Sequence, residues 1–337
     1  MSKEIYKNKT ILITGATGSF GKDFIKEILK KKLPFKKIII FSRDELKQHE
    51  MKFSNDFNEK KYTQLRFFLG DIRDKDRLLY AFKEVDYVIH AAALKQVLTG
   101  EYNPFEFIKT NVIGAQNIID AAIECDVKKV IALSTDKAVS PVNLYGATKL
   151  CSDKLFISSN NIRGKKNISF SLVRYGNVTG SRGSVIPEFI KQKKNGQFLI
   201  TDLNMTRFNI SLRSSVSMVL WSLENSIGGE IIVPKLKAYR VIDLAKAIDK
   251  KLKIKITGIR QGEKIHEELI SKADNLNAYD ISKYFVILNN EKKLLFYYKK
   301  KFNAKKTPNN FHYSSEAKSN FLDNSELKKM ISNFEKK

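Results

Sequence analysis

The sequence has little cysteine and no long hydrophobic run. Cys125 and Cys151 are the two cysteines in 337 residues, too few for a disulfide framework, so a reducing cytoplasm is the expected compartment. No apolar run reaches the roughly 18 residues that a membrane-spanning helix needs, so no membrane insertion is expected. The N-terminal segment MSKEIYKNKT has no apolar signal core, so no secretion is expected either.

Acidic residues are also scarce, with 36 Asp and Glu against 61 Lys and Arg, a formal net charge of +25. Nucleic-acid binding, attraction of anionic substrates and a lysine-rich genome could each explain this excess. The lysines are scattered in short runs such as Lys30–Lys32 and Lys299–Lys301, and no nucleic-acid-binding motif accompanies them. We therefore expect no nucleic-acid partner and favour a solvated basic surface, which would also attract nucleotide phosphates.

Short apolar segments alternate with helical patterns through the first half of the chain. This alternation predicts an α/β fold with a doubly wound parallel sheet, and near-continuously apolar strands fit a sheet covered on both faces. The expected strand cores are Ile11–Thr14, Ile38–Phe41, Leu65–Leu69, Val85–His90, Val130–Leu133 and Phe170–Arg174. The expected helices are Phe20–Lys31, Asp74–Phe82, Pro104–Ala122 and Leu144–Asn160.

The alternation becomes irregular after about residue 178. The short segments Ile231–Val233, Val241–Lys250 and Ile254–Gly258 suggest a smaller α/β lobe. We therefore expect two domains, 1–178 and 179–337, between which the chain can cross back. The tail from about Asn289 is rich in Lys and Asn and gives no clear pattern.

A glycine-rich turn follows the first expected strand and opens the first expected helix. In TGATGSFG, Gly15, Gly18 and Gly21 allow a tight turn and a close backbone approach to a pyrophosphate at the helix N-terminus. The sequence therefore predicts a dinucleotide site. The same turn contributes Thr17, Ser19 and Phe20 to the expected cofactor-binding residues.

The ends of the next strands favour NADP over NAD. An NAD site usually has an acidic residue at the tip of the second strand, whereas Ser42 and Arg43 stand there and suit a 2′-phosphate. The alternative is that Arg43 begins an exposed helix and pairs with a neighbouring acid. Asp71 and Ile72, after the third strand, are expected near the adenine. The small residues after the fourth strand leave room for the cofactor; they are Ala91, Ala92 and Ala93.

The segment LSTDKAVSPVNLYGATK carries the expected chemistry. On a helix, Tyr145 and Lys149 share one face, and a lysine cation lowers the pKa of a neighbouring phenol. Tyr145 is therefore a candidate proton acceptor for a hydroxyl group. Asp136 and Lys137 add an acid and a base at the end of the preceding strand, where open α/β sheets bind ligands.

The Tyr-x-x-x-Lys spacing alone is weak in so basic a chain. It recurs at Tyr279/Lys283 and Tyr297/Lys301, and only the position after the fifth strand distinguishes Tyr145. Likewise, Asp136 and Lys137 could form a simple surface ion pair.

Together these motifs resemble the extended short-chain dehydrogenase/reductase superfamily, and within it the inverting UDP-N-acetylglucosamine 4,6-dehydratases of pseudaminic acid synthesis. The similarity covers residues from about 10 to 270. The resembling blocks are ILITGATGSFGK, SRDELKQ, GDIRDKDRL, IHAAALK, EYNPFEFIKTNVIGAQN, ALSTDKA, NLYGATKLCSDKLF, VRYGNVTGSRGSVIP, MTRF, GGEIIVPK and GIRQGEKIHE. The resemblance implies a Rossmann-like domain that binds NADP, a nucleotide-sugar-binding lobe and a homo-oligomer, with a hexamer as one form.

The resemblance also implies roles for the residues in these blocks. Tyr145, assisted by Lys149 and Thr135, would deprotonate the hydroxyl on carbon 4 while NADP accepts the hydride. Lys137 would remove and return the proton on carbon 5 with inversion, and Asp136 would protonate the hydroxyl leaving carbon 6. Asn111 and Lys95 would lie at the cofactor, and Lys95 also near the substrate. The implied contacts of the nucleotide sugar are Asn177, Arg182, Arg207, Arg260 and Glu263. No metal is implied.

The sequence departs from the family pattern at several positions, which leaves the exact sugar and pathway open. The departures are Gln96, Leu98, Asn209, Gln261 and Phe321. The main alternative is a nucleotide-sugar epimerase or dehydratase-epimerase on the same fold, which would need Tyr145 and Lys149 but not Asp136 and Lys137. A non-catalytic NADP-binding protein is the alternative from another class.

Overall fold

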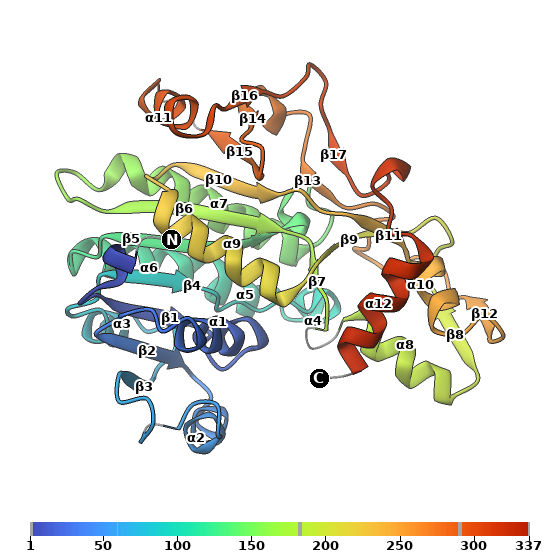
Figure 1. Ribbon diagram of the computed structural model, residues 1–337, viewed down its shortest axis with the longest axis horizontal. Helices are drawn as coiled ribbons and strands as arrows, with labels where there is room; N and C mark the ends of the chain where they lie inside the picture. Colours follow the sequence, from blue (N-terminus) through green and yellow to red (C-terminus); the bar gives the residue numbers. More distant parts are fainter. Residues whose placement is uncertain (1–2, 59, 181–183, 289–291, 336–337) are drawn as a thin grey trace.

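The computed structural model describes residues 3–58, 60–180, 184–288 and 292–335. Its centre is a ten-stranded sheet in the order β16-β14-β15-β10-β6-β5-β4-β1-β2-β3 (Figure 1). The strands are β1 (Thr10–Thr14), β2 (Lys37–Ser42), β3 (Leu65–Leu69), β4 (Tyr87–His90), β5 (Lys129–Thr135), β6 (Ser169–Tyr175), β10 (Glu230–Pro234), β14 (Ala278–Asp280), β15 (Tyr284–Leu288) and β16 (Lys305–Lys306). Pairing from β3 to β10 is parallel, and β15, β14 and β16 add antiparallel strands. The predicted doubly wound fold is confirmed.

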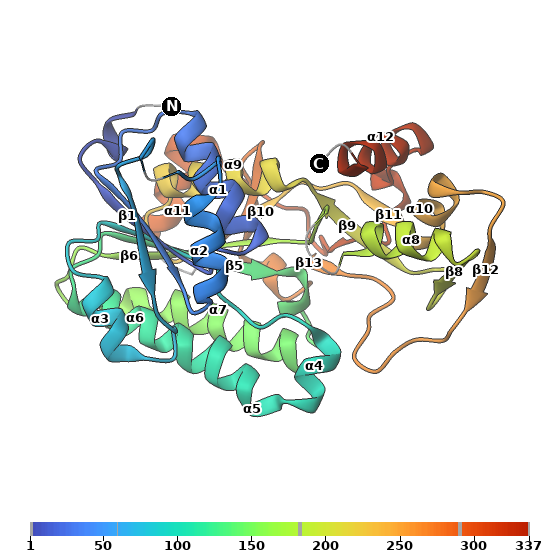
Figure 2. The same cartoon turned by 90° about the horizontal axis from the view of Figure 1, so that it is seen from below.

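Helices cover both faces of this sheet, as Figure 2 shows. One face carries α1 (Ser19–Lys30), α2 (Glu45–Phe53), α9 (Leu212–Asn225) and α11 (Lys292–Phe302). The other carries α3 (Lys75–Ala81), α6 (Gly114–Glu124) and α7 (Leu144–Ile162). Because both faces are covered, every residue of β1 and β4 is buried, which explains their near-continuous apolar sequences.

The second lobe lies beyond one end of the sheet strands (Figure 1). It contains α8 (Val185–Lys194), α10 (Val241–Ile248), α12 (Asn324–Glu335), β7 (Asn177–Val178), β8 (Gln197–Ile200), β9 (Thr206–Ile210), β11 (Ala238–Arg240), β12 (Lys253–Ile256), β13 (Glu268–Ile270) and β17 (Tyr313–Ser314). Phe189, Phe198 and Leu244 lie in its own apolar core.

The chain crosses between the two lobes several times. Ile231–Val233, expected in the small lobe, belongs to β10 and pairs with β6 of the large sheet, so that assignment was wrong. A three-residue apolar run cannot indicate which sheet it joins. The tail without a clear pattern supplies one helix to each lobe, α11 and α12.

The single helix expected over Pro104–Ala122 is interrupted. The structure has α4 (Val97–Tyr102), α5 (Pro104–Phe107), a π-helical turn at Ile108–Ile113 and then α6. Such turns often occur at functional sites. Among the described residues, no helix is both long and apolar enough to cross a membrane.

Candidate active site

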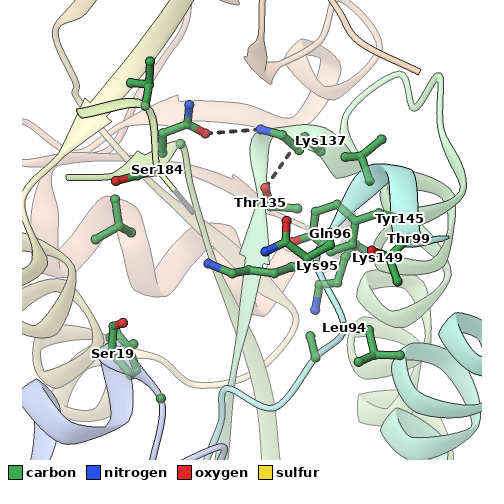
Figure 3. Close-up of a pocket in the computed structure, with 18 of the residues that line it drawn as sticks. Ser19, Leu94, Lys95, Gln96, Thr99, Thr135, Lys137, Tyr145, Lys149 and Ser184 are labelled. Carbon is green, nitrogen blue, oxygen red and sulfur yellow. Dashed lines mark hydrogen bonds between the residues drawn. The ribbon is translucent and has the colours of Figure 1, made fainter. Parts of the chain in front are cut away.

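A cavity of about 1400 Å³ lies at the carboxyl ends of the parallel strands, between the large sheet and the second lobe. Ligands of open α/β sheets bind at this edge. One part, here called the glycine end, is lined by Gly15, Gly18, Gly21, Ser42, Arg43 and Ala91–Ala93. The other part, the charged end, is lined by Thr135, Lys137, Tyr145, Arg207 and Glu267. Figure 3 shows that Lys95, Lys137, Tyr145 and Lys149 gather in one region of the cavity.

The glycine end has the shape that a dinucleotide requires. Gly15 has φ +65°, and a Cβ there would lie 2.9 Å from the amide nitrogen of Ala92. A Cβ on Gly21 would lie 2.5 Å from Ala16. Helix α1 begins beside them, and its N-cap Gly18 has no side chain that could cap the first helical amides. The first residues of the helix, Ser19–Gly21, line the cavity. These residues fit a pyrophosphate.

Beside the glycine turn, buried hydroxyl groups lie near an exposed arginine. Thr17 Oγ1 donates to Ser42 Oγ at 3.2 Å, while Arg43 Nη1 lies 3.5 Å from Asp71 Oδ2. Partial burial by itself would raise the pKa of Asp71, but Arg73 and Arg43 outweigh it and lower that pKa. Arg43 therefore has an ionic partner across the strand ends in Asp71. Ser19, Phe20 and Ile72 line the same region.

Asn111 lies behind the cavity wall. Its Oδ1 accepts from the backbone N–H of Leu94 at 2.9 Å, and its Nδ2 donates to the Leu94 carbonyl at 2.9 Å and to Thr148 Oγ1 at 3.0 Å. Asn111 itself does not line the cavity, whereas Lys95 does. The π-helical turn thus places Asn111 where it fixes the backbone that carries Lys95.

Tyr145 and Lys149 lie on the first turns of α7. Asn143 caps this helix by accepting from the Gly146 N–H at 2.8 Å, and it donates to the Gly262 carbonyl at 2.7 Å. Burial raises the pKa of Tyr145 to about 12, against lowering effects of Lys137 and a hydrogen bond with Thr135. Lys149 Nζ donates to the Leu133 carbonyl at 2.9 Å. Burial thus outweighs the lowering effects on this phenol, and the largest of those effects comes from Lys137. That Lys149 also lowers the pKa of Tyr145 stays a prediction.

Asp136 and Lys137 form a buried cluster with a third residue, Glu267. Lys137 Nζ lies 3.1 Å from Asp136 Oδ1, 3.1 Å from Glu267 Oε1 and 3.2 Å from Asn177 Oδ1. Burial alone would lower the pKa of Lys137, but the two carboxylates outweigh it and raise that pKa. The pair is therefore not a surface ion pair, and Lys137 carries a proton in this state.

Asp136 is fully buried and does not line the cavity, whereas its neighbours Thr135 and Lys137 do. Burial raises the pKa of Asp136, which Lys137 only partly opposes. Its Oδ1 accepts from Thr135 Oγ1 at 3.0 Å and from Lys137 Nζ, and its Oδ2 has no hydrogen-bond partner among the described residues.

The expected substrate contacts that the structure describes line the same cavity. Arg207 Nη1 donates to the carbonyls of Thr206 and Ile265, and Arg207 Nε lies 3.9 Å from Glu267. Glu263 Oε2 accepts from the backbone N–H of Arg260 at 3.2 Å. Asn177, Arg207, Arg260 and Glu263 all line the cavity, and Arg182 is outside the described residues.

Sequence reasoning missed three residues at the charged end: Tyr239, Lys264 and Glu267. Lys264 and Glu267 lie in the GIRQGEKIHE block, so the family resemblance already pointed to this segment of the chain. Nothing in its spacing revealed that Glu267 contacts Lys137.

The strand order, the glycine turn and the Tyr145/Lys149 pair define a dinucleotide-binding α/β protein of the extended short-chain dehydrogenase/reductase type. A family model described as "Polysaccharide biosynthesis protein" matches residues 11–289, and the chain belongs to that family.

Two relatives share much of the sequence. A Campylobacter jejuni protein named UDP-N-acetylglucosamine 4,6-dehydratase (inverting) is 50% identical, over 98% of this chain and 99% of its own. A Rickettsia canadensis protein named UDP-glucose 4-epimerase is 45% identical, over 84% of each chain.

Two solved structures share the fold. Pen from Bacillus thuringiensis has a TM-score of 0.86 and 35% identity, covering 98% of this chain and 99% of its own. DesIV from Streptomyces venezuelae, a dTDP-glucose 4,6-dehydratase solved with NAD and TYD, has a TM-score of 0.69 over 97% of each chain at 17% identity, which supports the fold alone.

Proposed function

We propose that this protein is an inverting UDP-N-acetylglucosamine 4,6-dehydratase that uses NADP. The product would be UDP-2-acetamido-2,6-dideoxy-β-L-arabino-hex-4-ulose, for pseudaminic acid or a related surface sugar. The observation that carries this proposal is the buried Asp136–Lys137 pair beside the phenol of Tyr145. The name and 50% identity of the Campylobacter jejuni relative support it.

The glycine end would hold the dinucleotide. The turn at Gly15, Gly18 and Gly21 would bind the pyrophosphate at the start of α1, and Ser42 and Arg43 would bind the 2′-phosphate. Lys149 would contact the nicotinamide ribose. A dinucleotide held there would supply a nicotinamide ring as hydride acceptor and hydride donor for the sugar. The DesIV structure, which shares this fold, was solved with NAD bound.

At the charged end, Tyr145 would take the proton from the hydroxyl on carbon 4. The charge of Lys137 and the hydrogen bond with Thr135 both favour the phenolate, against the effect of burial. The resulting ketone acidifies the proton on carbon 5, which Lys137 would remove and later replace from the other face. Asp136, whose Oδ1 accepts from Thr135 Oγ1 and Lys137 Nζ, would supply the proton for the hydroxyl leaving carbon 6.

Other residues that line the cavity would bind the substrate's nucleotide and sugar. Arg207 and Arg260 would face the diphosphate, and Asn177, Lys95 and Glu263 would contact the sugar or ribose hydroxyls. That Arg182 also contacts the nucleotide sugar stays a prediction from the sequence.

The decisive experiment is incubation with UDP-N-acetylglucosamine and NADP in deuterated water, followed by NMR. We expect a 4-keto-6-deoxy sugar with deuterium and inverted configuration at carbon 5. Retained configuration or a simple 4-epimer would refute the proposal.

A second candidate is a nucleotide-sugar 4-epimerase, favoured by the 45% identity to the Rickettsia canadensis relative. Epimerisation needs Tyr145 and Lys149 but no acid and base at 136 and 137. The variant Lys137→Ala would therefore keep epimerisation and lose dehydration.

We further propose that the protein forms a homo-oligomer in the cytoplasm, with a hexamer as the form to test. Exposed apolar side chains on α4 and α5 support an interface there, since Tyr102 is 88% and Phe105 59% exposed. Light scattering would show a single mass near one chain if this is wrong. The exposed free thiol of Cys151 suits a reducing compartment.

A further inference from the structure

Glu267 occupies a fixed, buried position beside Lys137. Its side chain is only 3% exposed, and it comes directly before β13. Its backbone N–H donates to Ser315 Oγ at 2.9 Å, and its carbonyl accepts from the Ser315 N–H at 2.9 Å. Ser315 thus holds both backbone polar groups of Glu267. This fixes the backbone from which the carboxylate reaches Lys137.

The two oxygens of the Glu267 carboxylate have different surroundings. Oε1 lies 3.1 Å from Lys137 Nζ and 3.9 Å from Arg207 Nε. Oε2 is buried and has no hydrogen-bond partner among the described residues. A buried carboxylate oxygen without a donor is costly, which often marks a functional group.

The charges around Lys137 distinguish its two carboxylate neighbours. Burial raises the pKa of Asp136. Burial alone would also raise the pKa of Glu267, but Lys137 and Arg207 outweigh it and lower that pKa. Glu267 is therefore the more readily ionised of the two carboxyl groups. The other charged or titratable groups at this cluster are Lys95, Tyr145, Tyr239 and Lys264.

A base at carbon 5 has to be a neutral amine, yet Lys137 is held as an ammonium ion. We propose that Glu267 is a positioning residue that holds Lys137 Nζ toward the cavity and accepts one of its protons before Lys137 acts on the substrate. This inference rests on the proposed dehydratase function.

The proton transfer is balanced within the pair. One Nζ–H bond of Lys137 breaks and one O–H bond of Glu267 forms, so an ammonium and a carboxylate become an amine and a carboxylic acid. A neutral pair is favoured over an ion pair when a bound sugar excludes water from the cavity. When Lys137 removes the proton from carbon 5, it becomes an ammonium ion again, and no oxidant or reductant is needed.

The test compares Glu267→Gln with the control Glu268→Gln. Glu268 is the next residue, but it accepts from Ser140 Oγ and contacts His312 instead of Lys137. We expect Glu267→Gln to lower kcat for dehydration about 100-fold with little change in KM, and Glu268→Gln to match the wild type.

The pH dependence of kcat distinguishes a Glu267 that accepts a proton from a Glu267 that only holds Lys137 in place. In Glu267→Gln, Lys137 has to lose its proton to solvent, so kcat should rise about tenfold per pH unit below the pKa of Lys137. The kcat of the wild type should show no such rise over the same pH range. A uniform loss of rate at every pH would overturn the proposal.

A second readout needs neither substrate nor cofactor. Removing the charge of Glu267 lowers the pKa of Lys137, so an amine-acylating reagent should label Lys137 about tenfold faster in Glu267→Gln. Peptide mass spectrometry measures this rate, with Lys235 as the internal reference. Unchanged labelling would refute the coupling. Faster labelling in a protein that dehydrates no substrate would instead refute the proposed function while keeping the coupling.

If Glu267→Gln does not fold, Glu267→Asp is the variant to use. It keeps the negative charge but shortens the side chain by one methylene, which moves the carboxylate away from Lys137. It should give an intermediate loss, about tenfold, with the wild-type pH profile. Full activity in Glu267→Asp together with unchanged labelling would overturn the proposal.

Discussion

The glycine end of the cavity is shaped by backbone and small side chains, whereas the charged end is built from buried ionisable groups. At the glycine end, Gly15 and Gly21 leave no room for a Cβ, and the wall opposite is Ala91–Ala93. At the charged end, Lys137 and Glu267 meet at 3.1 Å from distant parts of the sequence. The first end works through shape and the second through charge.

This difference affects how each end responds to substitution. At the glycine end, an added side-chain atom would clash with the neighbouring backbone. The clash should lower both the stability of the fold and the affinity for the cofactor. At the charged end, neutralising one group can leave the structure unchanged and still lower the reaction rate. The following predictions test that contrast, from the largest expected effect to the smallest.

Lys137→Met removes the amine of the charged end but keeps the length of the side chain. Without it, dehydration should slow by about 10²- to 10⁴-fold, because general acid–base groups contribute that much. NMR of the product measures the rate, and circular dichroism checks the fold. Lys235→Met, which removes a surface partner of Asp280, is the control. A loss of less than about tenfold would contradict the role of Lys137.

Gly15→Ala should damage the glycine end through sterics alone. Left-handed strain and overpacking together should cost about 2–5 kcal/mol of unfolding free energy and weaken dinucleotide binding. Gly164→Ala is a matched control, because Gly164 has φ +60° but nothing within 4 Å of a Cβ. It should cost about 1–2 kcal/mol and leave binding unchanged. Urea denaturation and cofactor titration measure both, and equal effects of the two variants would contradict the steric argument.

His90 should make stability depend on pH beneath the glycine end. Its Nδ1 lies 2.9 Å from Thr14 Oγ1, which also accepts from the Ala91 and Ala92 amides and so donates to a neutral imidazole. Burial, with a contribution from Lys149, lowers the pKa of His90 from 6.5 to about 3. The unfolded chain therefore binds the proton first as pH falls, and stability is lost between pH 6.5 and 3.

The expected loss from this group is about 2 kcal/mol between pH 6.5 and pH 5. His90→Asn should remove that part of the pH dependence, and the exposed His49→Asn should not. Chemical denaturation at several pH values measures it. Identical pH dependence in all three proteins would exclude a neutral, buried His90 as its cause.

Arg43→Ala should have the smallest effect and should act on cofactor choice. If Arg43 binds the 2′-phosphate, affinity for NADP should fall about tenfold and affinity for NAD should hardly change. Arg73→Ala is the control, because Arg73 also pairs with Asp71. Titration of both dinucleotides gives the ratio, and an unchanged ratio would favour NAD as the cofactor.

Sequence patterns predicted the first six strands and the glycine turn because these depend on local chemistry. A buried parallel strand has to be apolar throughout, and a turn with φ +65° at Gly15 favours glycine. Helix α2 was missed, since it is short and has only Gln48 and Met51 buried. The π-helical turn at Ile108–Ile113 leaves no sign in the apolar pattern.

The sequence by itself determined the class of fold, the dinucleotide turn and which of several Tyr-x-x-x-Lys pairs lies at a strand end. Only the tertiary structure decided the electrostatics. It directs Lys149 Nζ to the Leu133 carbonyl, buries Tyr145 so that its pKa rises, and brings Glu267 to Lys137. The physical reason is the distance over which the determinants act. Backbone conformation and strand burial follow from residues that are close in the sequence. A pKa depends instead on the burial of the group and on charges that the folded chain brings to it from distant positions.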